Sequence, residues 1–68
     1  MVEVDARGLQ CPEPVMMALA AIKEHPDEEI HVLVSSAIPR DNVERMCKKR
    51  GKDVTIAEDG SDFVLTVK

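Results

Sequence analysis

The sequence predicts a two-layer α/β sandwich, in which two helices cover one face of a four-stranded mixed sheet. Three observations lead to this fold class: stretches of alternating apolar and polar residues, two stretches with helical apolar spacing, and prolines where helices begin. The expected order is β-α-β-α-β-β, and right-handed crossovers would place both helices on one face. We expect one domain over residues 1–68, near the lower size limit for folding on a single core.

The two helices are expected over residues 12–24 and 39–50. The first ends before Pro26, because a proline pushes the preceding residue out of the helical region. The second has Pro39 in its first turn, where proline is tolerated, and ends at Gly51. Apolar residues at helical spacing supply the buried sides: Val15, Leu19, Ile22, Val43, Met46 and Cys47.

The four strands are recognised by apolar residues at every second position, which share one face of a sheet. A turn over residues 58–61 joins the last two strands as a hairpin. The intervening positions are mostly polar, as a water-facing sheet surface requires. The inward residues are Val2 and Val4, then Ile30, Val32 and Val34, then Val54 and Ile56, then Phe63, Leu65 and Val67.

One short stretch carries the chemistry, Gln10-Cys11-Pro12-Glu13-Pro14. We interpret Cys11 as the N-cap of the first helix, with Pro12 at N1 and Pro14 at N3. The amides of Glu13 and Val15 are then the donors near the sulfur, and a thiolate at a helix N-terminus is favoured by such donors and by the macrodipole. Neither proline is expected to contribute to packing, so the stretch is interpreted as a rigid mount for a reactive sulfur.

The composition limits the alternatives. The second cysteine, Cys47, lies on the apolar side of a helix and is expected to be a buried, inert thiol. The chain has no Cys-x-x-Cys pair, no His/Cys cluster, no export signal and no run of eighteen apolar residues. We therefore expect free thiols in the cytoplasm, with no zinc, other metal or cofactor and no membrane segment. Phe63 is the only aromatic residue, which disfavours nucleic-acid binding by base stacking.

Charge is distributed unevenly along this chain of net charge −4. Six of its nine lysines and arginines lie between Arg40 and Lys52, and the remainder is strongly acidic. Such asymmetry is typical of a docking surface, although a solvated helix end has the same pattern. Met16 and Met17 cannot both face inward, so an exposed apolar spot is expected beside Cys11. The candidate partner-binding residues are Met16, Met17, Arg40, Arg45, Lys48, Lys49 and Arg50.

The run from Asp5 to Pro14, with its Gly8-Leu9 turn and Cys-Pro-x-Pro, resembles the signature of the TusA-like (SirA-like) sulfur-carrier family. The resemblance covers the whole chain and continues at Arg40-Asp41 and in Met46-Cys47 followed by Gly51. The stretch beginning at Arg40 is also similar to the N-terminal module of the YedF-like branch. The resemblance implies strand order 1-2-4-3 with the last strand antiparallel to its neighbours.

The resemblance also implies that Cys11 accepts a sulfane sulfur as a persulfide and passes it to a partner's cysteine. Gly8, Leu9, Pro12, Glu13 and Pro14 would form the motif that caps the helix. The implied donors are cysteine desulfurases or rhodanese-like proteins, and the implied acceptors are DsrE-like proteins. The uses include tRNA thiolation and related sulfur or selenium metabolism. We expect the carrier to act as a monomer without contacting nucleic acid directly.

Two other functions stay open on the residues alone. The chain could be a non-catalytic module that binds an acidic protein or RNA through its basic second helix. It could also be a thiol redox protein, although no resolving cysteine lies next to Cys11 in the sequence. Of these two functions, only the non-catalytic module has no need of a nucleophilic Cys11.

Overall fold

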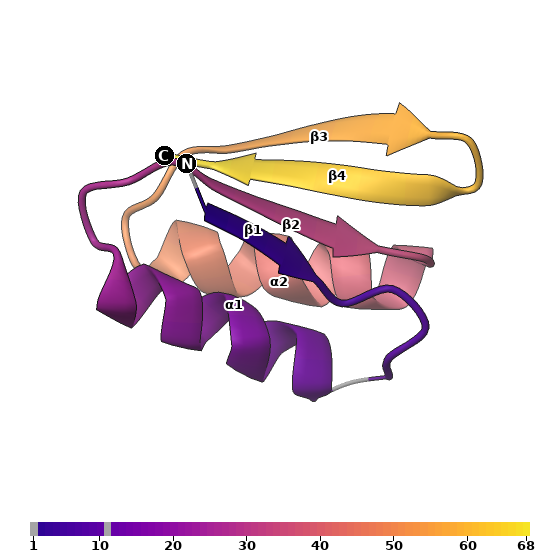
Figure 1. Cartoon of the computed structure of the whole chain (residues 1–68), viewed down its shortest axis with the longest axis horizontal. Coiled ribbons are helices and arrows are strands. Elements are labelled where there is room, and N and C mark those ends of the chain that lie inside the picture. The colour runs from indigo at the N-terminus through magenta and orange to yellow at the C-terminus, as the bar shows by residue number, and fades with distance from the viewer. Residues whose placement is uncertain (1, 11) are drawn as a thin grey trace.

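A computed structural model describes residues 2–10 and 12–68 and has the expected order of elements (Figure 1). Both helices pack against the same face of the sheet, so the predicted two-layer sandwich is confirmed. No helix in the described ranges is long and apolar enough to cross a membrane. The elements are β1 (Val2–Asp5), α1 (Glu13–Glu24), β2 (Ile30–Val34), α2 (Ala37–Lys49), β3 (Val54–Asp59) and β4 (Asp62–Val67).

The strands form one sheet in the order β1-β2-β4-β3. β1 and β2 are parallel, and β4 is antiparallel to both of its neighbours, as the family resemblance implied. The register aligns Val4 with Val32, Val32 with Leu65, and Leu65 with Ile56. Since side chains at paired positions share a face, this row crosses the whole sheet on its helix-covered side.

The core lies between the sheet and the helices. It is entirely apolar, because no polar or charged side chain of the described residues is buried. The helix α1 contributes small alanines to this core, and β2 and β4 contribute branched residues. The buried residues are Val4, Ala6, Ala18, Ala21, Ile22, Ile30, Val32, Val34, Val43, Cys47, Leu65 and Val67.

The first helix begins one residue later than predicted. Pro12 has φ −94° and ψ 7°, outside the helical region, and therefore occupies the N-cap position. Pro14 is consequently at N2, not N3. The first helical hydrogen bond runs from the Met16 N–H to the Pro12 carbonyl at 3.0 Å. The predicted N-cap, Cys11, lies outside the described residues.

The second helix begins two residues earlier than predicted, after an extended Ser36. Pro39 is still within the first turn, where its missing N–H has no intrahelical partner to lose. The predicted end at Gly51 is confirmed: Gly51 has φ +78°, its N–H donates to the Lys48 carbonyl, and the Lys52 N–H donates to the Cys47 carbonyl. This pair of bonds is a Schellman motif, which satisfies carbonyls at the helix end.

The β3–β4 hairpin is tighter than the predicted turn over residues 58–61. The strands continue until Asp59 pairs with Asp62, so only Gly60 and Ser61 form the loop. Gly60 has φ +65°, the conformation that a two-residue hairpin loop requires at its first position.

Candidate functional site

Four chain segments meet at one end of the molecule, opposite the two termini (Figure 1). They are the carboxyl ends of β1 and β2 and the first turns of α1 and α2. Parallel βαβ topology produces this arrangement, because each strand leads into a helix that runs back along the sheet. In the sequence, Cys11 lies between Gln10, which lines a hollow together with the first turn of α2, and Pro12, which is the N-cap of α1.

The loop after β1 is tied to the end of β2. The buried Ala6 donates its N–H to the Leu33 carbonyl at 2.8 Å, which extends the parallel ladder by one bond. The Gly8 N–H donates to Oγ of Ser35 at 2.8 Å. Gly8 has φ +79°, a conformation that costs a residue with a Cβ about 1 kcal/mol or more. The predicted Gly8-Leu9 turn is therefore an ordered loop with a defined anchor.

An exposed ion pair joins Asp5, at the end of β1, to Arg7 in this loop. Nε and one terminal nitrogen of Arg7 each donate to a different Asp5 carboxylate oxygen at 2.9 Å. The Arg7 backbone N–H also donates to Asp5, at 3.2 Å. The side-chain hydrogen bonds of Arg7, reinforced by its backbone bond, lower the pKa of Asp5 to about 2. Arg7 also approaches Asp62 at 3.9 Å, so this arginine is engaged by β1 and β4.

The start of α1 differs from the predicted mount in two ways. The Glu13 N–H donates to the Gln10 carbonyl at 3.0 Å, so it is not an uncommitted donor for a sulfur. The Pro14 side chain is fully buried, which makes the expectation of two prolines without packing wrong for Pro14. Pro12 and Glu13 are exposed, as expected. The motif thus combines a hydrogen-bonded turn with one proline that packs into the protein.

A hollow of about 390 Å³ adjoins this turn. It lies between the loop before Cys11 and the first turn of α2, and its walls are mainly apolar. Ile38 is the most exposed of its apolar residues, at 71%. The lining residues are Leu9, Gln10, Ser36, Ile38 and Pro39. Such a hollow admits a side chain of another protein next to the loop.

The predicted partner-binding cations do not form one free surface. Arg40 stacks over the Phe63 ring at 4.7 Å from its centroid and pairs with Asp41 at 2.9 Å, so it is held within the protein. Lys48 pairs with Glu44 one helical turn earlier, at 3.1 Å.

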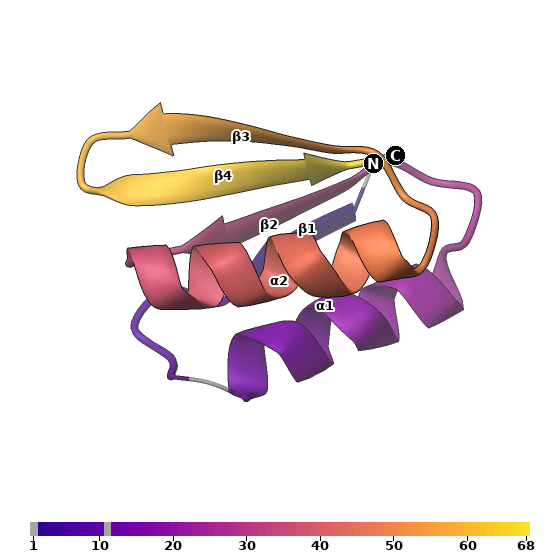
Figure 2. The ribbon, with the colours of Figure 1, turned by 180° about the vertical axis from the view of Figure 1, so that it is seen from behind.

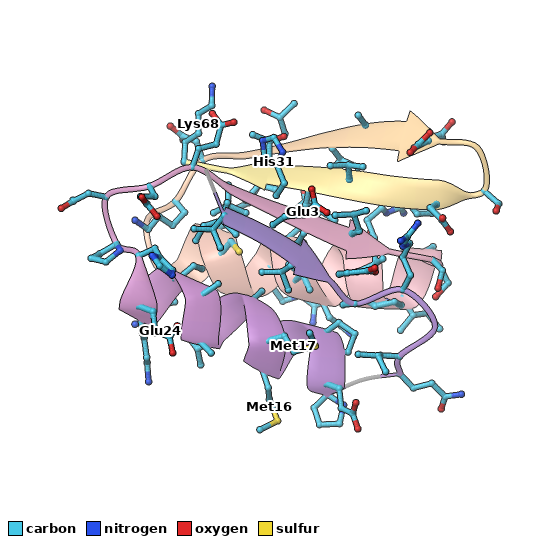
Figure 3. The ribbon with its side chains drawn as sticks, in the orientation of Figure 1. Glu3, Met16, Met17, Glu24, His31 and Lys68 are labelled. Carbon is cyan, nitrogen blue, oxygen red and sulfur yellow. The ribbon has the colours of Figure 1, made fainter. Side chains whose placement is uncertain are left out.

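The three remaining cations, Arg45, Lys49 and Arg50, gather around a second hollow between the two helices. The two predicted methionines separate as well. Met16 is 62% exposed and projects from α1 away from the sheet, whereas Met17 lies at the edge next to β1 (Figure 3). Of the predicted partner-binding residues, the structure therefore brings only Arg45, Lys49 and Arg50 together around one hollow.

Cys47 is confirmed as a buried free cysteine with no exposed surface. Burial raises the pKa of its thiol, which Lys52 offsets only in part. A buried thiol with a raised pKa is a poor nucleophile, so we assign Cys47 to the core and not to the reactive site. Within residues 2–10 and 12–68, no three His, Cys, Asp or Glu side chains lie close enough together to hold a metal ion.

Sequence reasoning did not assign Ser35 and Ile38 to the site. Ser35 follows β2 and lies 27 positions from Gly8, so no local pattern relates the two residues. Its position after a strand and before a helix is a signal that could have been used, because loops at the carboxyl ends of strands often carry function. Ile38 could have been noticed as an apolar residue on the polar side of α2.

Comparisons with known proteins agree with this geometry. The sequence model of the family described as Sulfurtransferase TusA matches residues 2–68. The crystal structure of a SirA-like protein from Desulfitobacterium hafniense superimposes with a TM-score of 0.91 at 30% sequence identity, over 98% of this chain and 95% of that one. A family match of this extent, together with the same fold, leads to one conclusion: the chain belongs to the TusA family of sulfurtransferase-type proteins.

Proposed function

We propose that the protein is a sulfur carrier, which holds a persulfide on Cys11 and relays the sulfur from a donor protein to an acceptor protein. Membership of the TusA family is the observation that carries this proposal. The loop geometry supports it, because the residues on both sides of Cys11 in the sequence are anchored by hydrogen bonds. Cys47 is buried, so the proposal assigns the exchange to the other cysteine of the sequence, Cys11.

The proposed step is a thiol–persulfide exchange. The Cys11 thiolate attacks the terminal sulfur of a donor persulfide, R–S–S–H. A new S–S bond forms on Cys11, the donor's S–S bond breaks, and the donor leaves as its thiolate R–S⁻. No net oxidation takes place, so the step requires no external oxidant or cofactor. Release to an acceptor's cysteine repeats the same exchange in the other direction.

The helix start supplies the activation in this proposal. Pro12 and Pro14 lack N–H groups, and the Glu13 N–H is committed to Gln10. The Val15 amide and the dipole of α1 are then the candidates for stabilising a thiolate on Cys11. The hollow next to Gln10 gives the incoming sulfur-bearing side chain room to approach.

The biological setting follows from the chemistry. A reducing compartment keeps Cys11 as a thiol, so we place the carrier in the cytoplasm, where it acts as a monomer. The proposed donors are cysteine desulfurases or rhodanese-like proteins, and the proposed acceptors are DsrE-like or similar proteins. tRNA thiolation or a related sulfur or selenium pathway would use the delivered atom.

The test is to incubate the protein with a cysteine desulfurase and cysteine, or with polysulfide, and to measure its mass. We expect the addition of one sulfur atom that reductant removes and that peptide mapping places on Cys11. Cys11→Ser should abolish the addition, and the matched control Cys47→Ala should retain it. Persistence of the label in Cys11→Ser would contradict the proposal and favour a non-catalytic interaction module.

A further inference from the structure

The outer face of the helical layer has a hollow of its own, between α1 and α2. The helices run side by side in the same direction (Figure 2). The hollow has a volume of about 410 Å³ and lies apart from the one next to Gln10. It is lined by Val15, Asn42, Arg45, Met46, Lys49 and Arg50.

The chemistry of this hollow is amphipathic. Val15 of α1 and Met46 of α2 are half-buried and form an apolar floor. Methionine adapts its shape to varied partners, which suits such a floor to protein recognition. Arg45, Lys49 and Arg50 are exposed and line the hollow beside it. None of these three cations forms an ion pair with a described residue, in contrast to Arg40 and Lys48.

The length of the hollow fits a helix. Its residues recur at helical spacing along α2 from Asn42 to Lys49 and continue to the C-cap residue Arg50. At a rise of about 1.5 Å per residue, they extend roughly 12 Å, or two turns. A groove of two helical turns with an apolar floor and charged walls is the type of surface that receives an amphipathic helix.

The charge of the protein selects the partner. The net charge is −4, so an acidic partner is repelled by most of the surface and attracted only where cations gather. Nucleic acid fits this hollow less well, because the floor is aliphatic and the only aromatic ring, Phe63, lies under Arg40 instead of facing a base.

We infer that the groove between α1 and α2 docks an acidic amphipathic helix of a protein partner. The inference that this partner delivers or receives sulfur rests on the proposed function, because Val15 follows Cys11 by only four residues in the sequence. The docking itself does not depend on the sulfur chemistry. It would orient a partner along the helices while the partner's cysteine reaches the end of the sheet.

The experiment uses the Cys11→Ser protein, which lacks the proposed persulfide site, and a short peptide as the probe. The peptide carries leucines at i, i+3, i+4 and i+7 with glutamates at the flanking positions. Its control has the same composition in scrambled order. Titration followed by NMR should shift the signals of Val15, Met46 and Lys49, and the affinity should fall as salt is raised.

A pair of charge-matched variants locates the effect. Arg45→Gln with Lys49→Gln should weaken peptide binding about tenfold. Lys23→Gln with Lys68→Gln removes the same charge elsewhere and should leave the affinity within about twofold of the parent. Each variant alters exposed side chains, and its NMR spectrum shows whether it is folded.

Three results would overturn the inference: no binding, equal weakening by both double variants, or equal binding of the scrambled peptide. Displacement of the peptide by an RNA oligonucleotide would reassign the groove to nucleic acid. Because the variant has no Cys11 thiol, these outcomes are independent of persulfide formation on Cys11. Conversely, a parent protein that fails to acquire sulfur would refute the carrier function and leave the docking result intact.

Discussion

The backbone N–H of Gly8 donates a 2.8 Å hydrogen bond to Oγ of Ser35, across 27 positions of sequence. This bond joins the loop before Cys11 to the end of β2, beside the ladder bond from Ala6 to Leu33. The loop is therefore positioned by the central part of the sheet and not by local turn geometry alone.

The first prediction is that Ser35→Ala slows sulfur uptake more than it reduces stability. Water can replace the hydroxyl at this exposed site, so the free energy of unfolding should fall by no more than about 1 kcal/mol. The loop nevertheless loses an anchor, and we expect the rate of persulfide formation on Cys11 to fall severalfold. Uptake from polysulfide, measured by mass spectrometry, checks this.

The control is Ser61→Ala, because Ser61 is exposed in the β3–β4 loop and does not line the hollow next to Gln10. The two variants remove the same atom from exposed serines. If Ser61→Ala slowed uptake as much as Ser35→Ala, the Gly8–Ser35 bond would have no special role.

The second prediction distinguishes the two prolines of the motif. Pro14 is fully buried, and its replacement by alanine removes two buried carbon atoms. We expect Pro14→Ala to lower the free energy of unfolding by about 1–2 kcal/mol. Pro12 is exposed, and Pro12→Ala should cost less than about 1 kcal/mol, mainly through a more flexible unfolded chain.

Urea unfolding of both variants measures the difference in their free energies of unfolding, provided that the m-value, the slope of this free energy with urea concentration, is the same for both. Equal losses would mean that the buried surface of Pro14 contributes nothing. We also expect Pro12→Ala to slow sulfur uptake despite its small effect on stability, since it loosens the turn closed by Glu13 and Gln10.

Some features of the fold could be predicted from the sequence alone and others could not. The element types and the inward faces followed from apolar periodicity, as the row Val4, Val32, Leu65 and Ile56 confirms. The order of the strands did not, because local periodicity contains no information on which strands pair; it came from the family resemblance. Helix starts were wrong by one or two residues, since proline fits several positions of the first turn.

Long-range contacts within the candidate site were beyond sequence reasoning. The burial of Pro14 depends on the packing of the whole sandwich, and the Gly8–Ser35 bond depends on two loops that the fold brings together. The cations of α2 looked equivalent in the sequence. Only the structure separates Arg40, which stacks on Phe63, from Arg45 and Lys49, which line the groove.

The third prediction concerns acid. Hydrogen bonds from Arg7 lower the pKa of Asp5 from 3.8 to about 2 in the folded protein. A carboxyl with a lowered folded-state pKa stabilises the fold above its unfolded-state pKa, and this contribution is lost as the pH falls through the folded-state value. The stability difference between the parent and Asp5→Asn should therefore shrink as the pH falls from about 4 to about 2.

Urea unfolding at a series of pH values measures this difference. Asp27→Asn is the control, because Asp27 is exposed and has no ion pair with a described residue. Its pH series gives the baseline against which the series for Asp5→Asn is compared. A difference for Asp5→Asn that stayed constant with pH would show that the Arg7 pair does not favour the charged carboxylate.

The fourth prediction concerns the second thiol. Cys47 has no exposed surface, and burial raises the pKa of its thiol, so a maleimide reagent can reach the reactive form only when the core opens. In the Cys11→Ser protein, alkylation of Cys47 should be slower than that of an unfolded thiol by about a thousandfold or more, since small domains are stable by roughly 5 kcal/mol. The rate should rise with urea in parallel with the unfolded population.

In the Cys47→Ala protein, Cys11 should instead react in the absence of urea, at a rate that changes little below the unfolding transition. Rapid alkylation of Cys47 in the native state would mean that two thiols compete for sulfur, and the carrier would then lack a single defined attachment site.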